Sequence, residues 1–246
     1  MDQIKQFQIA RCERIERNSQ DAALQGAARV FLKESLRTKY SYNFSWMGRP
    51  IIQYPQDIVA LQEIIWCVKP DLIIETGIAH GGSLIFSASM LELIGGQGTV
   101  LGIDVDIRDH NRTEIENHPM FRRIKMIEGS SIDEQIIQEV EKIVNNHTTV
   151  MVFLDSNHTC DHVLEELRLY SPFVSKGSYI VVFDGIIEEV SEHVSEDRPW
   201  GPGNSPLTAI RHFLRSNTDF SVDEEAENKA LITAAPSGYL KRIHQK

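Results

Sequence analysis

From about residue 70 onward, short apolar runs alternate with longer segments in which apolar residues recur at helical spacing. The short runs are rich in Val, Ile and Leu, which is typical of strands buried on both faces of a parallel sheet. The predicted strands are Leu72–Glu75, Thr99–Val105, Ile124–Glu128, Val150–Asp155 and Tyr179–Asp184. The predicted helices between them are Ser83–Ile94, Arg112–Asn117, Asp133–Asn145 and Asp161–Phe173. This alternation predicts an α/β domain with a doubly wound, Rossmann-like sheet.

The segment before this alternation has a different pattern. Residues 3–37 lack proline and place apolar residues at helical intervals, so they predict one or two helices. Residues 40–53 are aromatic and irregular, and Pro55 suits the first turn of a helix that runs to Val68. We therefore expect a helical extension with an aromatic loop over residues 1–54 and the α/β domain over residues 55–246.

The pattern changes again after Asp184. A long polar loop is predicted over residues 185–204, followed by a helix at Pro206–Ser216. Phe220–Ala226 and Leu231–Ala235 are then predicted as two strands that form an antiparallel hairpin at the edge of the sheet.

Composition excludes several classes of protein. The chain has 246 residues and a formal net charge of −10, which argues against nucleic-acid binding and against a polybasic membrane surface. Its three cysteines are widely spaced and form no Cys-x-x-Cys pair, so neither a zinc site nor a disulfide framework is predicted. No signal-peptide core and no apolar run of about 18 residues is present, so we expect a cytoplasmic protein without a membrane span.

The first predicted strand runs into a glycine-rich turn with the spacing Glu-x-Gly-x-x-x-Gly-x-Ser. This pattern differs from the dinucleotide motif Gly-x-Gly-x-x-Gly and lacks the Gly-Lys-Ser/Thr of a phosphate loop. A strand that breaks into such a turn at a helix start lets a ligand meet free backbone N–H groups. The segment resembles the first motif of S-adenosylmethionine (SAM) dependent methyltransferases. The candidate cofactor contacts are Glu75, Gly77, Ala79, His80 and Ser83. In an ordinary turn of another α/β enzyme, Glu75 would instead cap the N–H groups that follow it.

Acids gather at the predicted carboxyl ends of the strands, where ligands bind in open α/β sheets. Asp104 ends the second strand and is the candidate for the ribose hydroxyls of a nucleotide, with Asp106 as the alternative. Ser131 follows the third strand and either faces the adenine or caps the helix that begins near Asp133.

Asp155 and Asp184 each end an apolar strand, 29 positions apart. Oxygen ligands from two strand ends suit Mg²⁺, which uses few carboxylates and keeps several waters. His158 lies three residues after Asp155, so a turn can point both into one pocket, where a neutral imidazole can act as a general base. The alternatives are that each carboxylate caps a nearby turn and that the histidine is solvated.

With these residues in view, the chain from Tyr40 to Ile243 resembles the cephalosporin hydroxylase/rhamnosyl O-methyltransferase family, which is similar to catechol O-methyltransferase. The segments that carry the resemblance are Glu75–Ser83, Leu154–His158, Val181–Asp184, Arg198–Pro206 and Gly238–Arg242. It implies a seven-stranded SAM-methyltransferase sheet with a C-terminal antiparallel hairpin. It also implies SAM contacts at Glu75, Asp104, Ser131 and Asp155, and Mg²⁺ ligands at Asp155 and Asp184.

Two positions depart from the catechol-type pattern. His158 stands where those enzymes have a catalytic lysine, which keeps base catalysis possible but changes its pH range. Gly185 stands where they usually have an asparagine ligand, so a third protein ligand is missing at that point. Glu188, Glu189 or water are the substitutes.

The resemblance therefore implies a SAM- and Mg²⁺-dependent O-methyltransferase that acts on a hydroxyl of a sugar or glycosylated small molecule, and we expect a homo-oligomer. One alternative is a SAM-fold protein that binds a ligand without turnover. The other is an iron and 2-oxoglutarate hydroxylase, which is disfavoured because the chain has no His-x-Asp or His-x-Glu and its βα alternation does not suit a jelly roll.

Overall fold

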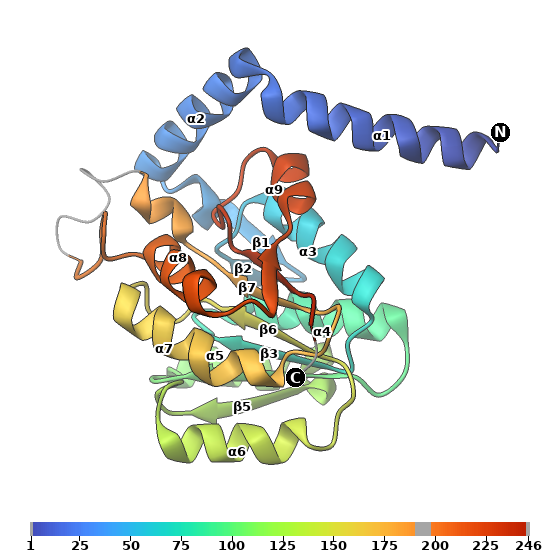
Figure 1. The fold of residues 1–246 in the computed structure, drawn as a ribbon. Helices are drawn as coiled ribbons and strands as arrows, with labels where there is room; N and C mark the ends of the chain where they lie inside the picture. The colour runs from blue at the N-terminus through green and yellow to red at the C-terminus, as the bar shows by residue number, and fades with distance from the viewer. Residues whose placement is uncertain (1, 190–197, 245–246) are drawn as a thin grey trace.

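The sheet of this protein lies between two layers of helices, as Figure 1 shows for the computed structural model. The structure describes residues 2–189 and 198–244. The strands are β1 (Phe44–Trp46), β2 (Arg49–Ile51), β3 (Leu72–Thr76), β4 (Thr99–Asp104), β5 (Ile124–Glu128), β6 (Val150–Leu154), β7 (Tyr179–Val182), β8 (Phe220–Val222) and β9 (Tyr239–Arg242). Seven of them form the large sheet in the order β5-β4-β3-β6-β7-β9-β8.

The helices other than the last one agree closely with the periodic segments of the sequence. They are α1 (Gln3–Gln20), α2 (Ala22–Arg37), α3 (Pro55–Val68), α4 (Gly82–Ile94), α5 (Asp109–Glu116), α6 (Glu134–Val144), α7 (Cys160–Tyr170), α8 (Pro206–Ser216) and α9 (Glu224–Ala230). Short 3₁₀ turns lie at η1 (Tyr40–Asn43), η2 (Pro119–Arg123), η3 (Ser171–Phe173) and η4 (Gly185–Glu188). Across the described ranges, none of these helices combines the length and apolar character that a bilayer crossing requires.

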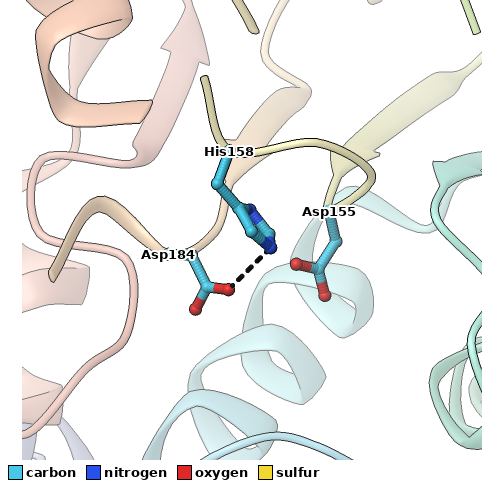
Figure 2. A group of neighbouring side chains, drawn as sticks. All are labelled: Asp155, His158 and Asp184. Carbon is cyan, nitrogen blue, oxygen red and sulfur yellow. Dashed lines mark ion pairs between the residues drawn. The ribbon is translucent and has the colours of Figure 1, made fainter. Parts of the chain in front are cut away.

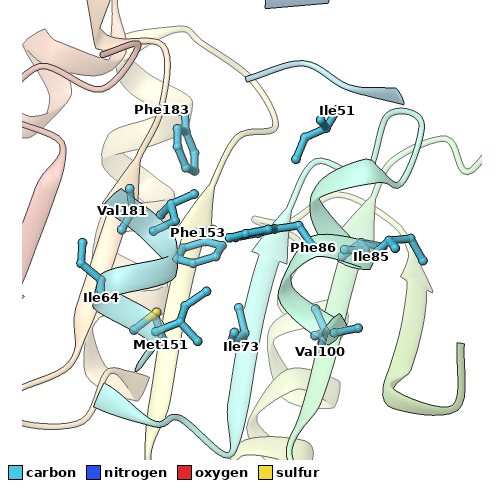
Figure 3. Packing of buried hydrophobic residues seen from close by; sticks show 14 of the residues in the cluster. Ile51, Ile64, Ile73, Ile85, Phe86, Val100, Met151, Phe153, Val181 and Phe183 are labelled. Atoms are coloured by element: carbon cyan, nitrogen blue, oxygen red, sulfur yellow. The ribbon is translucent and has the colours of Figure 1, made fainter. Parts of the chain in front are cut away.

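Side chains alternate between the two faces of the sheet and so build two separate cores. Ile73 and Phe153 point to the face covered by α3 and α4, whereas Ile74 and Leu154 point to the face covered by α6, α7 and α8. Figure 3 shows the first core, to which α4 contributes Phe86 and β2 contributes Ile51. The doubly wound sheet is therefore confirmed.

The order of the strands reverses direction at β3. From β3 the chain moves outward to β4 and β5, and it then returns to pair β6 with the other side of β3. Such a reversal opens a crevice at the carboxyl ends of the two central strands, which is where open α/β sheets bind ligands.

The predicted C-terminal strands are partly wrong. An antiparallel pair does close the edge of the sheet, but it consists of β8 and β9, and the predicted strand Leu231–Ala235 does not exist. Residues 224–230 form α9 instead, because the Asp223 side chain accepts a hydrogen bond from the Ala226 N–H and acids fill the first turn. A true two-strand hairpin is thus replaced by a strand–helix–strand connection.

The N-terminal segment forms two helices and a small hairpin. Asp21 ends α1 and caps α2 by accepting hydrogen bonds from the N–H groups of Ala23 and Leu24. In Figure 1, α1 extends away from the body, and Ile15 is its only buried residue. The stretch predicted as irregular contains the β1–β2 hairpin, which packs on α4 through a hydrogen bond from Trp46 Nε1 to Ser89 Oγ (3.0 Å). The boundary at residue 54 stays a prediction.

Candidate functional site

The glycine-rich turn lies directly against the end of β6. Gly77 has φ 89°, and a Cβ atom there would come within 2.1 Å of the Asp155 carbonyl oxygen. Only glycine fits both the backbone conformation and this close approach. The turn continues through Ala79, which has φ 46°, to Gly81 at the start of α4. Residues 77–80 and Ser83 line a hollow together with residues 50–53 and Asp155.

Asp104 holds this turn in place. Its Oδ2 accepts hydrogen bonds from the backbone N–H groups of Ile78 (2.7 Å) and Ala79 (3.3 Å). Asp106 is exposed and pairs with Arg108 at 3.7 Å, so it faces away from the turn. Of the two acids considered at the end of the second predicted strand, Asp104 is therefore the one that contacts the glycine-rich turn.

Glu75 is buried and only partly satisfied. Its side chain is 2 % exposed, and Ser83 Oγ donates a hydrogen bond to Oε1. Oε2 is buried without a hydrogen-bond partner among the described residues. Burial raises the pKa of Glu75 to about 8, and the Ser83 hydroxyl opposes that rise only in part. Because Asp104 accepts the N–H groups of the turn, the capping role considered for Glu75 is not seen.

Asp155, His158 and Asp184 form one cluster, shown in Figure 2. One ligand atom from each lies within 4.8 Å of the others, and His158 Nε2 is 3.2 Å from Asp184 Oδ2. Burial and then the charge of Asp184 raise the pKa of Asp155 well above its usual value. The prediction that the ends of β6 and β7 bring these three side chains together is thus confirmed.

Gln53 is a neighbour of this cluster that the sequence analysis did not identify. Its Nε2 donates to Asp155 Oδ2 at 3.3 Å, while its Oε1 is buried without a partner in the described parts of the chain. The aromatic stretch before α3 gave no signal that one of its polar residues would reach the end of β6.

Glu188, considered as a third metal ligand in the segment after Asp184, has its carboxylate engaged elsewhere. Glu188 Oε2 accepts hydrogen bonds from the Gly203 N–H (3.0 Å), Ser205 Oγ and Thr208 Oγ1 (3.0 Å), which hold the loop before α8. In that loop the ring of Trp200 stands edge-on to His158, with 4.8 Å between ring centroids. Residues 190–197 of the predicted polar loop lie outside the described residues.

His80 turns away from the carboxylates and towards α5. Its ring Nδ1 lies 3.4 Å from Asn111 Oδ1, and its carbonyl accepts hydrogen bonds from Arg49 Nε (3.0 Å) and Nη2 (2.7 Å). Asn111 Nδ2 also donates to the Ala79 carbonyl at 2.9 Å. Arg49 and Asn111 therefore fix the turn from outside, and no pattern in the sequence marked either residue.

Ser131 does not cap a helix. Asp133 is the N-cap of α6, and its side chain accepts from the Gln135 N–H at 2.8 Å. Ser131 Oγ instead lies 3.1 Å from His162 Nε2 on α7. Of the two roles considered for Ser131, the capping role is wrong.

Comparison with known proteins agrees with this geometry. The model of the family "Rhamnosyl O-methyltransferase/CmcI" matches residues 38–243. The rhamnosyl O-methyltransferase of Mycobacterium bovis (strain BCG / Pasteur 1173P2) is 32 % identical over 203 residues, covering 80 % of this chain and 78 % of that protein. The corresponding enzyme of Mycobacterium leprae is 30 % identical over 200 residues, covering 80 % and 82 %.

A solved structure described as "CmcI-N160 apo-structure" superposes with a TM-score of 0.60 at 16 % identity, covering 83 % of this chain and 78 % of that one. At that identity the superposition establishes the SAM-methyltransferase fold alone. The extent of the family match and the curated relatives establish the rest: the chain belongs to the rhamnosyl O-methyltransferase/CmcI family and is, by enzyme class, a SAM-dependent O-methyltransferase.

Proposed function

We propose that this enzyme transfers the methyl group of SAM to a hydroxyl of a sugar or of a glycosylated small molecule, with Mg²⁺ held by Asp155 and Asp184. The observation that carries the proposal is the cluster of Asp155, His158 and Asp184 next to the glycine-rich turn. The curated relatives are named for a rhamnosyl acceptor, which favours a sugar hydroxyl here.

The residues present fit SAM. Glu75 Oε2 and Gln53 Oε1 are buried oxygens without partners among the described residues, and both residues line a hollow beside Ser83. Leaving such groups unpaired is costly, so a ligand with hydrogen-bond donors and a positive charge would stabilise this edge. The residues proposed to surround the cofactor are Glu75, Gly77, Ala79, His80, Ser83, Asp104, Ser131 and Asp155.

The residues present also fit a hard divalent cation. Asp155 and Asp184 offer carboxylate oxygens from two strand ends, and their repulsion is one cause of the raised pKa of Asp155. Mg²⁺ prefers oxygen ligands and keeps several waters, so two carboxylates suffice and Gly185 is tolerated. A solved structure described as "cmcI-D160 Mg-SAM" has a TM-score of 0.59 to this chain, at 16 % identity over 82 % of this chain and 78 % of that one.

Each residue then has a distinct part in the reaction. When bound, SAM would supply the methyl group, and Mg²⁺ held by Asp155 and Asp184 would lower the pKa of the acceptor hydroxyl. His158 Nε2, 3.2 Å from Asp184 Oδ2, takes the proton of that hydroxyl as the hydroxyl oxygen bonds to the methyl carbon. The bond between that carbon and the sulfur breaks at the same time, and S-adenosylhomocysteine leaves. Glu75, Asp104 and the turn hold the donor in place, which makes the attack effectively intramolecular. Trp200, whose ring centroid lies 4.8 Å from that of His158, would lie beside the acceptor.

The two other functions lose support. An iron and 2-oxoglutarate hydroxylase needs two histidines and one carboxylate, whereas the cluster described here has one histidine and two carboxylates. A binding protein without turnover would not need a histidine placed between the two strand-end acids.

The direct test is the release of S-adenosylhomocysteine from SAM in the presence of Mg²⁺ and a library of deoxysugar glycosides. We expect product with at least one sugar acceptor and its loss when EDTA removes the metal. If methylation proceeded equally in EDTA, the metal would have no part in the reaction. If none of the sugar acceptors increased the release of S-adenosylhomocysteine, a sugar would not be the substrate.

We also propose that α1 joins copies of this chain into a homo-oligomer. Ile4 and Phe7 on α1 are 68 % and 65 % exposed, and apolar side chains on a projecting helix are typical of a contact surface. Light scattering of the full chain should give more than one protomer, and Phe7→Glu should reduce that mass. The cytoplasmic location stays a prediction.

A further inference from the structure

A second group of polar side chains lies near the ends of β5 and β6, and of its members only Ser131 was given a part above. His162 on α7 points Nε2 at Ser131 Oγ (3.1 Å) and at Ser156 Oγ (3.3 Å). Ser156 follows Asp155 at the end of β6, and its hydroxyl donates to Glu166 Oε1 at 2.7 Å. The group therefore links the loop after β5, the loop after β6 and the first two turns of α7.

Glu166 is an unusual residue for a purely structural position. It is completely buried, and its Oε2 has no hydrogen-bond partner in the described ranges. His162 Nε2 lies 3.6 Å from its Oε1. A buried carboxylate kept half-satisfied is costly, which points to a role in orienting its neighbours rather than in packing.

The hydrogen positions in this group follow from the donors available. Ser156 Oγ donates its single proton to Glu166 Oε1. Ser156 Oγ can then only accept from His162, which requires the proton on Nε2. This same N–H also faces Ser131 Oγ. Ser131 thus acts as an acceptor towards His162, and its own proton is left free to point away from the group.

Ser131 occupies a position suited to the base of the cofactor. It follows β5, the neighbour of β4, at whose end Asp104 is proposed to hold the ribose. The unsubstituted ring nitrogens of adenine accept hydrogen bonds and carry no proton. A serine whose proton is free is the matching donor.

We propose that His162, fixed by Glu166 through Ser156, sets the Ser131 hydroxyl as the hydrogen-bond donor to a ring nitrogen of the adenine of SAM. His162 is then a positioning residue that determines cofactor specificity. The inference rests on the proposed placement of the cofactor at Asp104 and Ser131, and it adds the residues that select the base.

The test measures binding of S-adenosylhomocysteine and of its 1-deaza, 3-deaza and 7-deaza analogues by titration calorimetry. Each analogue replaces one ring nitrogen with C–H. The wild-type protein should bind one analogue about tenfold more weakly than the parent ligand, because one hydrogen bond is lost. Ser131→Ala and His162→Ala should bind the parent about tenfold more weakly and should no longer discriminate against that analogue.

Three further variants separate orientation from folding. His162→Gln keeps an N–H donor of similar reach and should restore part of the discrimination. Glu166→Gln replaces the carboxylate that accepts the hydrogen bond of Ser156 with an amide, and it should reduce the discrimination against the analogue. Glu165→Gln is the same change one residue earlier, at a side chain that is 43 % exposed, and should behave as wild type. Thermal unfolding of each variant shows whether it is folded.

Equal loss of affinity for the parent ligand and for every analogue in folded His162→Ala would overturn the inference, because a structural role alone gives that result. It would leave the proposed function intact. If the wild-type protein bound neither the parent ligand nor the analogues, the placement of the cofactor itself would fall, and the inference would fall with it.

Discussion

Asp71 and Glu75 lie at opposite ends of the same buried strand, yet their surroundings act on them in opposite ways. Asp71 precedes β3 and accepts hydrogen bonds from the N–H of Thr148 (3.0 Å), the Thr148 hydroxyl (2.8 Å) and the N–H of Thr149 (2.9 Å). Although partial burial opposes it, these donors lower the pKa of Asp71. Glu75 receives one hydroxyl donor, and burial raises its pKa to about 8.

The same contrast holds for the two ends of the parallel strands, called here the amino edge and the carboxyl edge of the sheet. At the amino edge, Arg242 donates to the carbonyls of Pro172 (3.2 Å) and His244 (3.1 Å) and lies 3.7 Å from Asp219. At the carboxyl edge, where the parallel strands end, Glu75 is buried and Asp155 is half-buried, and among the described residues neither forms an ion pair with a lysine or arginine. Fully paired charges stabilise the fold, whereas under-paired buried acids with raised pKa values are typical of functional sites. Stability and chemistry therefore occupy opposite edges.

The largest effect is expected from Asp155→Asn. This change keeps the shape of the side chain but removes the negative charge of one of the two proposed metal ligands, so methyl transfer in Mg²⁺ should fall by roughly a thousandfold. Affinity for S-adenosylhomocysteine should stay within about threefold, as calorimetry can show. Asp71→Asn is the matched change at the other edge and should keep nearly full turnover. A wild-type rate in Asp155→Asn would contradict the claim that the acids at the carboxyl edge, unlike those at the amino edge, take part in the reaction.

His158→Ala should lower the methylation rate by about 10²-fold, which is the lower end of the usual contribution of a general base. His158→Lys restores a basic group at the position where catechol-type enzymes have lysine, so activity should return in part and shift to higher pH. Single-turnover rates over a range of pH measure both effects. Unchanged rates in His158→Ala would rule this histidine out as the base.

Asp71→Asn should lower the free energy of unfolding by about 1–3 kcal/mol, because the carboxylate loses its interaction with three donors. Since the pKa of Asp71 is lower in the folded protein, its stabilising effect is present at neutral pH and is lost as pH falls through the folded pKa. Urea unfolding at about pH 7 and about pH 3 should therefore show a smaller difference between wild type and variant at the lower pH. An equal difference at both values would contradict this account of Asp71.

Glu75→Gln should raise the free energy of unfolding at high pH, whereas Asp71→Asn lowers it at neutral pH. The pKa of Glu75 is raised in the folded protein, so its contribution to stability is present below the unfolded pKa and is lost as pH rises through about 8. The variant should therefore unfold with a higher free energy than wild type above about pH 8, while binding S-adenosylhomocysteine about tenfold more weakly. Lower stability at high pH together with unchanged affinity would make Glu75 a structural acid like Asp71.

The smallest expected effect is the pH dependence of metal binding. Burial and the charge of Asp184 raise the pKa of Asp155, so protons compete with Mg²⁺ for this carboxylate at lower pH. The affinity for Mg²⁺ should increase between about pH 6 and about pH 8, with release of protons on binding. Calorimetry in two buffers of different ionisation enthalpy measures both. An affinity that does not change with pH would indicate that the metal binds elsewhere.

The sequence was most informative where buried strands end in acids. The five βα strands, the glycine-rich turn and the cluster of Asp155, His158 and Asp184 were all predicted, because periodicity and parallel strand ends determine them. The C-terminal strands were predicted less well, because Leu231–Ala235 is apolar but leads into the turn at Pro236 and Gly238 before β9.

Long-range polar contacts could not be predicted. Arg49 reaches His80 from 31 positions away, and Ser131 meets His162 across the same separation. In the sequence, Glu166 is one residue of a predicted helix, and only the fold shows that its side chain contacts the loop after β6. Such partners depend on how the elements pack, which no local pattern records.

The central claim is that the carboxyl edge of the sheet gathers its under-paired acids around SAM and a divalent cation. A crystal structure of the protein with S-adenosylhomocysteine and Mn²⁺, which takes the same oxygen ligands as Mg²⁺ and scatters anomalously, tests this most directly. The account predicts an anomalous peak between Asp155 and Asp184, with the ribose at Asp104 and the adenine beside Ser131. A metal peak away from these two carboxylates, or a nucleoside bound at another edge of the sheet, would contradict it.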